Sequence, residues 1–191
     1  YRNRSSQLGI FLRNLHPLLR KQQLDYTIFV VNQTDSNTFN RAMLMNVGFQ
    51  EALLSANWSC AVFHDVDLLP EDDRNLYTCP EQPRHLSVAV DKFKYRLPYR
   101  AIFGGATAVS VEQFRKLNGY SNMFWGWGGE DDDMSKRIQF HGLKITRYPA
   151  NIGRYTMIKH EQEKTNNLRQ AFLASGPRRY TTDGLNSLSY S

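Results

Sequence analysis

Apolar runs of strand length alternate with stretches of helix length along most of this 191-residue chain. The runs at residues 26–31 and 60–64 are continuously apolar, which is typical of strands buried on both faces. Apolar residues at helical spacing predict a helix at 8–19, and residues 40–54 read as a second one. Because alternating strands and helices build a sheet covered by helices, the pattern predicts an α/β fold with a mostly parallel sheet.

The alternation continues in the second half of the chain. Strands are expected at 86–90 and 107–109, and Ser110–Gln113 is a capping box that should begin a helix. A further helix is expected from residue 130 to about 140. The polar stretch 159–170 lacks any such pattern and predicts a long mobile loop. A length of 191 residues fits one domain, so residues 1–191 are expected to form a single domain.

Composition narrows the possible functions. With 41% hydrophobic and 22% charged residues, the chain is globular and not disordered. No apolar run approaches the roughly 20 residues of a membrane span, and the start shows no signal-peptide pattern. A net charge of +6 suits an anionic partner. The basic residues are scattered, without a block of five, which argues against nucleic acid and leaves a membrane or a phosphorylated small molecule as the anionic partner.

Two features favour a secretory-pathway protein. Cys60 and Cys79 are too few for zinc-finger ligation but could form one disulfide. Asn3, Asn32 and Asn57 each begin an N-x-Ser/Thr sequon and are candidate glycosylation sites.

Asp65-Val66-Asp67 directly follows an expected buried strand. Ligands of open α/β sheets sit at the carboxyl ends of the strands. Carboxylates at i and i+2 of an extended chain lie on the same side, so one can hold a divalent cation while the other fixes a sugar or a water. Hard oxygen ligands suit Mn²⁺ or Mg²⁺. A polar turn is the alternative interpretation of a motif this short.

The segment 124–133 reads Phe-Trp-Gly-Trp-Gly-Gly-Glu-Asp-Asp-Asp and is far more specific. Its glycines allow close approach of the backbone to a ligand, and Trp125 and Trp127 offer the flat platforms on which sugar rings stack. The helix dipole accounts for one or two acids at a helix start. Four adjacent acids repel one another and raise at least one carboxyl pKa, which suits a general base. A position at the start of a helix lowers the carboxyl pKa instead, because the helix dipole stabilises the negative charge.

Met157-Ile158-Lys159-His160 is less informative by itself. A lone histidine is usually structural or merely exposed, and a thioether is a soft ligand for a hard cation. Spacing alone therefore argues against metal binding here.

Taken together, these motifs resemble the β-1,4-galactosyltransferase family. The resemblance covers almost the whole chain in the family's order. It implies a GT-A (Rossmann-like) fold, an inverting mechanism, a UDP-sugar donor and Mn²⁺ as cofactor. The resemblance also implies that Cys60 and Cys79 pair, and that the chain is the luminal part of a type II Golgi membrane protein without its anchor and stem. The matching motifs are 39–42, 65–70, 91–93, 103–105, 125–133 and 183–188.

The same resemblance implies roles for individual residues. Asp131 matches the catalytic base, and Glu130 beside it contacts the donor sugar. The metal ligands would be Asp67, Met157 and His160, which reverses the expectation from spacing. Donor-binding positions are Arg2, Arg4, Phe39, Arg41, Asp65, Val66, Lys92, Ile102, Gly105 and Trp127, and acceptor-binding positions are Tyr99, Gly129 and Asp132.

Two departures from the family pattern bear on specificity. Vertebrate galactosyltransferases have Tyr where this chain has Ile102, and Ile opens the space that an N-acetyl group needs. Ile102 therefore points to UDP-GalNAc as donor. The stretch between His160 and Asp183 is shortened, and either Leu168 or Phe172 would contact the N-acetyl group of the acceptor.

The expected function is inverting transfer of GalNAc to the 4-hydroxyl of a terminal GlcNAc on a glycoprotein or glycolipid, with Asp131 as base. The first alternative is a β-1,4-galactosyltransferase using UDP-Gal on the same acceptor. A sugar-binding module without turnover and a hydrolase using two carboxylates are further alternatives. The segment 155–175 and the Trp127 loop are expected to close over bound donor.

Overall fold

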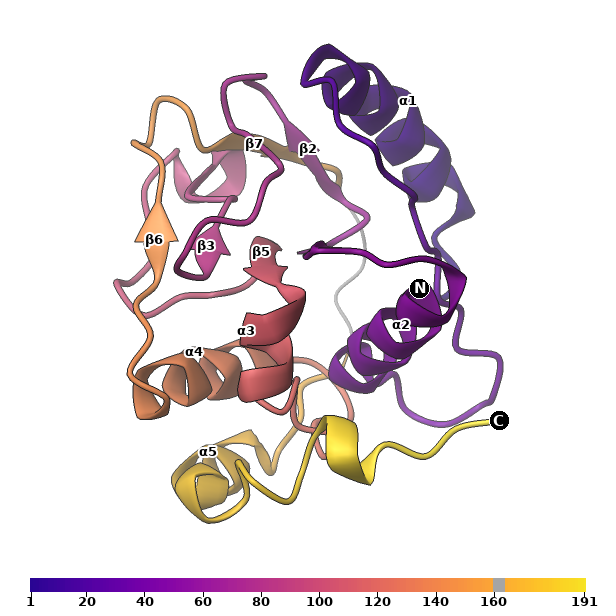
Figure 1. The fold of residues 1–191 in the computed structure, drawn as a ribbon, viewed down its shortest axis with the longest axis vertical. Coiled ribbons are helices and arrows are strands. Elements are labelled where there is room, and N and C mark those ends of the chain that lie inside the picture. The colour runs from indigo at the N-terminus through magenta and orange to yellow at the C-terminus, as the bar shows by residue number, and fades with distance from the viewer. Residues whose placement is uncertain (160–163) are drawn as a thin grey trace.

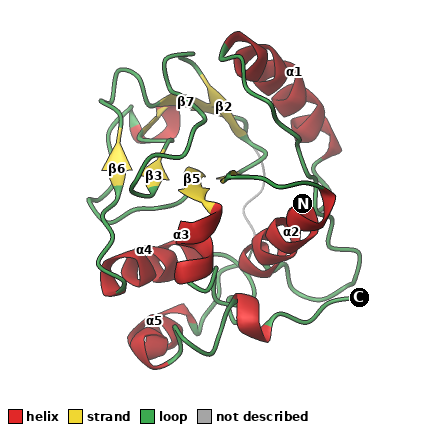
Figure 2. Cartoon of the chain, viewed as in Figure 1, coloured by secondary structure: helices red, strands yellow, loops and turns green. Residues whose placement is uncertain are grey.

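The computed structural model of the protein describes residues 1–159 and 164–191. Over these ranges, helices and short strands alternate along the chain (Figures 1 and 2). The helices are α1 (Ser5–Lys21), α2 (Arg41–Ser55), α3 (Val111–Lys116), α4 (Glu130–Phe140) and α5 (Arg169–Ser175). The strands are β1 (Cys60–His64), β2 (Leu68–Pro70), β3 (Arg84–His85), β4 (Ala89–Val90), β5 (Ala106–Ser110), β6 (Thr146–Arg147) and β7 (Arg154–Met157).

The strands form two small mixed sheets, in the orders β1-β5-β3-β6 and β2-β7-β4. The pairs β1/β5, β3/β5 and β2/β7 are antiparallel, whereas β3/β6 and β4/β7 are parallel. The α/β class is confirmed, but the prediction of a mostly parallel sheet is wrong. β5 lies between β1 and β3 and runs against both. A continuous apolar run shows that a strand is buried and says nothing about the direction of its neighbours.

β5 separates two hydrophobic cores. Val109 points into the first core, which holds apolar residues of α2, α3 and α4. Ala106 and Ala108 point into the second, with Leu15 and neighbouring residues of α1. Alternate side chains of one strand thus serve opposite faces of the sheet. Figure 1 shows α1 on one side of the strands and α2, α3 and α4 on the other.

Three predicted elements differ from the structure. Residues 26–31 are extended but belong to neither sheet, with Phe29 and Val30 exposed by 40% and 44%. Of the expected strand 86–90, only Ala89–Val90 is a strand, β4, while β3 lies just before this range and belongs to the other sheet. The expected loop at 159–170 gives way to α5 at residue 169.

Other local predictions are confirmed. Ser110 Oγ accepts from the Gln113 backbone N–H at 3.0 Å, and Gln113 Oε1 accepts from the Ser110 N–H at 2.9 Å, which completes the capping box. Cys60 and Cys79 form the expected disulfide. Among the helices of the described ranges, none is both long and apolar enough to cross a membrane.

Candidate active site

The Asp65-Val66-Asp67 segment follows β1, as expected for a site at the end of a strand. The Arg41 Nε and Nη2 groups each lie 2.6 Å from Asp65 Oδ1. Arg41 begins α2, whose N-cap Asn40 accepts from the Met43 N–H at 2.9 Å. The cap therefore fixes the start of the helix that brings Arg41 to the carboxylate.

Asp67 and Met157 are brought together by the pairing of β2 with β7. Leu68 lies opposite Met157 in this ladder, and the Ile158 N–H donates to the Asp67 carbonyl at 2.7 Å. Asp67 is buried, at 8% exposure. His160, the third expected ligand, lies outside the described residues.

A divalent cation fits what these two positions offer. One hard carboxylate just before β2 and one thioether on β7 would supply only part of a coordination sphere. Over residues 1–159 and 164–191, no group of three or more His, Cys, Asp or Glu side chains is placed to hold a metal alone.

The acidic cluster begins α4, and its four side chains go to different places. Gly129 precedes it at φ +100, a conformation that a side chain at this position would strain, and a Cβ there would lie 2.7 Å from Phe124 Cε1. Asp133 turns into the protein, where its Oδ2 accepts from Arg137 Nε at 2.8 Å. The pairing with Arg137 thus accounts structurally for Asp133, and the other three acids line the cavity.

Asp131 faces the turn before β5. A Cβ added to Gly104 would lie 2.6 Å from Asp131 Oδ2, so only glycine admits the carboxylate this closely. Burial, with the charges of Glu130 and Asp132, raises the pKa of Asp131 to about 7 despite the opposing charge of Arg41. Crowding and burial therefore outweigh the helix start, and the group is suited to general base catalysis near neutral pH.

Glu130 is 9% exposed, and burial raises the pKa of its carboxyl while the charge of Arg41 opposes that rise. Arg41 Nη1 lies 3.4 Å from Glu130 Oε1. Glu130 Oε2 is buried and has no hydrogen-bond partner within the described part of the chain. A carboxylate oxygen left in this state at a cavity suits a hydroxyl of a bound sugar.

Tyr99 and Asp132 are paired across the cavity. The Tyr99 hydroxyl donates to Asp132 Oδ1 at 2.8 Å, and burial together with the Asp131 and Asp132 charges raises the Tyr99 pKa well above its usual value. The phenol thus stays protonated and fixes Asp132, an expected acceptor contact.

The Trp127 loop is held from two directions. Gly126 N–H donates to the Phe39 carbonyl at 2.7 Å, while Trp127 N–H donates to the Lys164 carbonyl at 2.9 Å. Asn166 N–H donates back to the Trp127 carbonyl at 3.0 Å. The Trp127 side chain itself stays 48% exposed. Backbone bonds therefore connect the loop to the segment expected to close with it.

The expected site residues gather around one cavity of about 2050 Å³. Every predicted catalytic, metal, donor and acceptor residue lines it except His160, of which the structure describes nothing. Arg2 lies over the Phe39 ring at 5.3 Å from its centroid. The residues at the cavity are Arg2, Arg4, Phe39, Arg41, Asp65, Val66, Asp67, Lys92, Tyr99, Ile102, Gly105, Trp127, Gly129, Glu130, Asp131, Asp132 and Met157.

Two supporting residues, Ser87 and Arg147, were not predicted from the sequence. Ser87 Oγ donates to the Gly104 carbonyl at 3.1 Å and accepts from the Ala106 N–H at 2.9 Å, which fixes the turn against Asp131. Arg147 Nη2 donates to the Ile102 carbonyl at 2.7 Å. No local signal marks either residue, because both contact the turn from positions distant in sequence.

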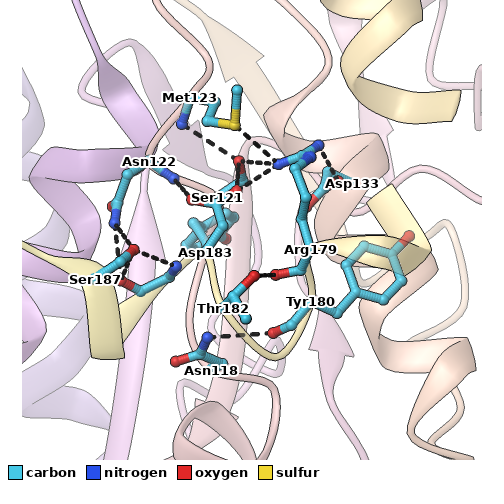
Figure 3. Close-up of polar contacts among 12 residues, drawn as sticks. Asn118, Ser121, Asn122, Met123, Asp133, Arg179, Tyr180, Thr182, Asp183 and Ser187 are labelled. Carbon is cyan, nitrogen blue, oxygen red and sulfur yellow. Dashed lines mark hydrogen bonds and ion pairs between the residues drawn. The ribbon is translucent and has the colours of Figure 1, made fainter. Parts of the chain in front are cut away.

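A network of polar residues around Asp183 supports the segment that precedes the Trp127 loop (Figure 3). Asp183 Oδ1 accepts from the Asn122 N–H at 2.9 Å, and its Oδ2 accepts from Ser121 Oγ and Arg179. Arg137, fully buried, lies 3.6 Å from Asp183 and is bonded to Asp133. The 183–188 motif thus carries a structural role at the base of the segment that presents Trp127.

Comparison with known proteins identifies the fold and the family. Residues 1–80 match the N-terminal region of glycosyl transferase group 7, and 84–161 match the N-terminal domain of galactosyltransferase. The chain is 53% identical to β-1,4-galactosyltransferase 4 of Mus musculus and 50% to that of Homo sapiens, with all of this chain covered. It spans about half of those relatives, 56% of their length.

Solved structures agree with this comparison. A mutant of Drosophila β-1,4-galactosyltransferase 7 in complex with manganese, UDP-Gal and xylobiose superposes with a TM-score of 0.83 at 31% identity, covering 100% of this chain and 82% of that one. The wider set of relatives includes β-1,4-galactosyltransferase 6 of Rattus norvegicus, 48% identical over 192 residues, all of this chain and 50% of that one. The fold is therefore of the GT-A type, and the chain belongs to the β-1,4-galactosyltransferase family.

Proposed function

We propose that the protein is an inverting β-1,4-galactosyltransferase, which moves galactose from UDP-Gal to the 4-hydroxyl of a terminal GlcNAc. The observation that carries this proposal is the position of Asp131, a carboxyl with a pKa of about 7 between donor-side and acceptor-side residues. Galactose, the sugar of the first alternative, is favoured over GalNAc because the relatives are named galactosyltransferases and one solved neighbour holds UDP-Gal.

The chemistry is one displacement. The Asp131 carboxylate takes the proton from the acceptor 4-hydroxyl while that oxygen forms its bond to the anomeric carbon. The bond from that carbon to the β-phosphate oxygen breaks at the same time, and UDP leaves with the electron pair. Attack from the opposite face converts the α linkage into β. No covalent intermediate arises, so no second nucleophilic carboxylate is required.

Other residues position the two sugars. Glu130 Oε2, buried without a described partner, accepts from a hydroxyl of the donor sugar. Asp132, fixed by Tyr99, accepts from the acceptor sugar. Arg2, Arg4 and Lys92 offset the charge of the diphosphate.

Asp67, Met157 and His160 would hold Mn²⁺, the ion present in a solved relative. When bound, the ion offsets negative charge on the diphosphate as UDP leaves. The carboxylate of Asp67 supplies the hard ligand of the set.

A second candidate donor is UDP-GalNAc, and Ile102 is the observation that favours it. Ile102 lines the cavity beside Gly104 and Gly105. Its side chain is shorter than the Tyr of the vertebrate pattern and leaves room for an N-acetyl group. For the acceptor N-acetyl group, Leu168 is favoured, because it is 60% exposed while Phe172 packs against Phe124 at 5.6 Å.

The cellular setting follows from the same family membership. The domain is proposed to face the Golgi lumen on a type II membrane anchor that lies outside this chain. The disulfide suits an oxidising compartment, and Asn3, Asn32 and Asn57 are exposed as glycosylation requires.

The test is turnover with UDP-Gal and UDP-GalNAc on a β-GlcNAc acceptor, with Mn²⁺ and with EDTA. We expect transfer of galactose that EDTA abolishes and added Mn²⁺ restores. A kcat/KM for UDP-GalNAc above that for UDP-Gal would assign the second candidate donor. Binding of both sugars without product would reduce the protein to a sugar-binding module, and release of free sugar without acceptor would indicate a hydrolase.

A further inference from the structure

His85 lies behind the turn that carries Ile102 and Gly104, in a row of buried polar groups. It belongs to β3, which lies between β5 and β6 in the sheet (Figure 1). In the parallel β3/β6 pair, His85 lies opposite Arg147. Its side chain is 1% exposed, and the proposed mechanism gives this imidazole no task. What its two ring nitrogens contact therefore decides what the residue can do.

The hydrogen bonds of His85 have one possible direction. Arg147 Nε lies 3.1 Å from His85 Nδ1, and a guanidinium can only donate, so Nδ1 accepts and carries no proton. A neutral imidazole then bears its proton on Nε2, which lies 3.3 Å from Ser87 Oγ. The partner on β6 thus fixes the tautomer of His85 and turns its Nε2–H into a donor toward Ser87.

Ser87 continues the row in the same direction. Its Oγ accepts from the Ala106 N–H at 2.9 Å and from His85 Nε2. These two bonds occupy both lone pairs of the hydroxyl and leave its single proton for the Gly104 carbonyl, at 3.1 Å. Every donor and acceptor between the guanidinium and this carbonyl therefore has one assigned partner.

Arg147 reaches the same turn by a second route. Its Nη2 donates to the Ile102 carbonyl at 2.7 Å and to the Arg100 carbonyl at 3.0 Å. Phe103, the next residue of the turn, is 1% exposed, and its ring centroid lies 6.4 Å from that of His85. The turn is therefore bound directly at one carbonyl and through the imidazole and serine at another, and both routes begin at one guanidinium.

We propose that His85 is a positioning residue for the catalytic base. As the neutral Nε2–H tautomer, it joins Arg147 to Ser87, and the resulting chain holds Gly104 against the Asp131 carboxylate. A Cβ on Gly104 would lie 2.6 Å from Asp131 Oδ2, so even a small displacement of the turn changes the space around that carboxylate. The inference rests on the proposed function, in which Asp131 is the base.

An imidazole suits this position because it stays neutral there. Burial, with the charge of Arg147, lowers the pKa of His85 to about 3. His85 therefore keeps one tautomer over the whole pH range in which Asp131 titrates. Burial is also the largest cause of the raised Asp131 pKa. A turn released from its chain would admit water to the carboxylate and lower that pKa.

The experiment titrates the Asp131 carboxyl directly. Protein with ¹³C-labelled aspartate carboxyls is followed by NMR as the pH is changed, and the spectrum of Asp131→Asn identifies the signal. His85→Leu breaks the chain, while His85→Gln has an amide that can both accept and donate and is the matched control. Ser87→Ala breaks the next link, and with His85→Leu it completes a double-mutant cycle.

The variants leave unchanged the titratable and charged groups that face the Asp131 carboxyl. These are Arg41, Tyr99, Glu130 and Asp132. A shifted midpoint therefore reports the position of the turn and not an altered charge. The dissociation constant of UDP is measured beside the titration, because the proposed UDP contacts lie on other segments.

We expect the Asp131 midpoint to fall by about one pH unit or more in His85→Leu and in Ser87→Ala, and no further in the double variant. His85→Gln should retain most of the wild-type midpoint, and UDP binding should stay unchanged in all of them. Midpoints equal to that of the wild type in both single variants would overturn the proposal. Shifts that add in the double variant would also overturn it, because two links of one chain cannot act separately.

The tautomer provides a test that needs no variant to fold. The ¹⁵N NMR signals of labelled histidine distinguish the two neutral forms, and a proton on Nδ1 of His85 would overturn the proposal. The titration also needs no turnover. An inactive protein whose Asp131 midpoint moves as expected would refute the proposed function and support the positioning role, and an active protein with unmoved midpoints would do the reverse.

Discussion

At the scale of single residues, the environment of Asp131 decides its chemistry. The sequence indicates four crowded acids but leaves the direction of the pKa open, because a helix start and like charges oppose each other. In the structure, burial beside Gly104 is the largest contribution, and it depends on the distant turn before β5. The residue type was therefore predictable, and its pKa was not.

We expect Asp131→Asn to lower kcat by roughly 10²–10⁴-fold, the usual contribution of a positioned general base, while binding of UDP is unchanged. Folding raises the pKa of Asp131 to about 7. The protonated carboxyl therefore contributes its full stability below the pKa of the unfolded state, and this contribution is lost as the pH rises through 7. Asn should thus raise Tm more at pH 8 than at pH 5. Near-normal kcat in this variant would transfer the role of base to Glu130 or Asp132.

The pH–rate profile follows from the same carboxyl. Only the ionised form accepts a proton, so kcat/KM should fall as pH drops through about 7. Because the Asp132 charge helps to raise that pKa, Asp132→Asn should move the inflection to lower pH. The profile is measured with saturating Mn²⁺ at each pH, and an inflection near 4 in the wild type would contradict the assignment.

Ile102 is the residue proposed to affect the choice of donor. Tyr in its place would extend a ring and hydroxyl into the N-acetyl space, while Ile leaves an apolar wall. Ile102→Tyr should raise the ratio of galactose to GalNAc transfer at least tenfold, about 1.4 kcal/mol of differential transition-state binding. Ile102→Leu keeps the space open and is the control. A ratio of kcat/KM values that stays constant would remove Ile102 from donor selection.

At the scale of elements, local sequence signals predict the helices well, whereas the pairing of strands distant in sequence is not predicted. α4 occupies Glu130–Phe140 as its acids and spacing predict, and the capping box at Ser110 is intact. β6 and β7 went unpredicted, because strands of two to four residues are too short for a periodic pattern. Likewise, Asp67 and Met157 meet only through the β2/β7 register, which spacing in the sequence does not encode.

Substitution of Asp183 tests whether its polar network stabilises the segment before the Trp127 loop. Asp183→Asn removes the carboxylate that Ser121, Asn122 and Arg179 share, and should cost about 3 kcal/mol, as for other broken buried ion pairs. Urea unfolding measures the loss. Ser187→Ala is the control at the rim of the same group and should cost below about 1 kcal/mol. An Asp183→Asn protein as stable as wild type would show that the network is not stabilising.

At the scale of the whole molecule, the disulfide connects the start of β1 to the long segment before β3. Cys60 and Cys79 are 19 residues apart. By restricting the unfolded chain, the cross-link should raise the free energy of unfolding by about 3 kcal/mol. Changing both cysteines to serine should lower the urea midpoint accordingly. Dithiothreitol should have the same effect on the wild type and none on the variant. Equal urea midpoints of the wild type with and without dithiothreitol would contradict the predicted stabilisation by the disulfide.

The extended segment Tyr26–Val31, which belongs to neither sheet, carries a consequence for handling the protein. Within the described part of the chain, residues 26–30 make no backbone–backbone hydrogen bond, and Phe29 and Val30 are exposed. Such extended backbone is a template for strands from other molecules. A preparation of the 1–191 chain should therefore lose monomer faster as its concentration rises, and its aggregates should bind thioflavin T. A short soluble peptide that occupies the edge should then act as a preservative, which keeps the stock monomeric without touching the catalytic carboxylates.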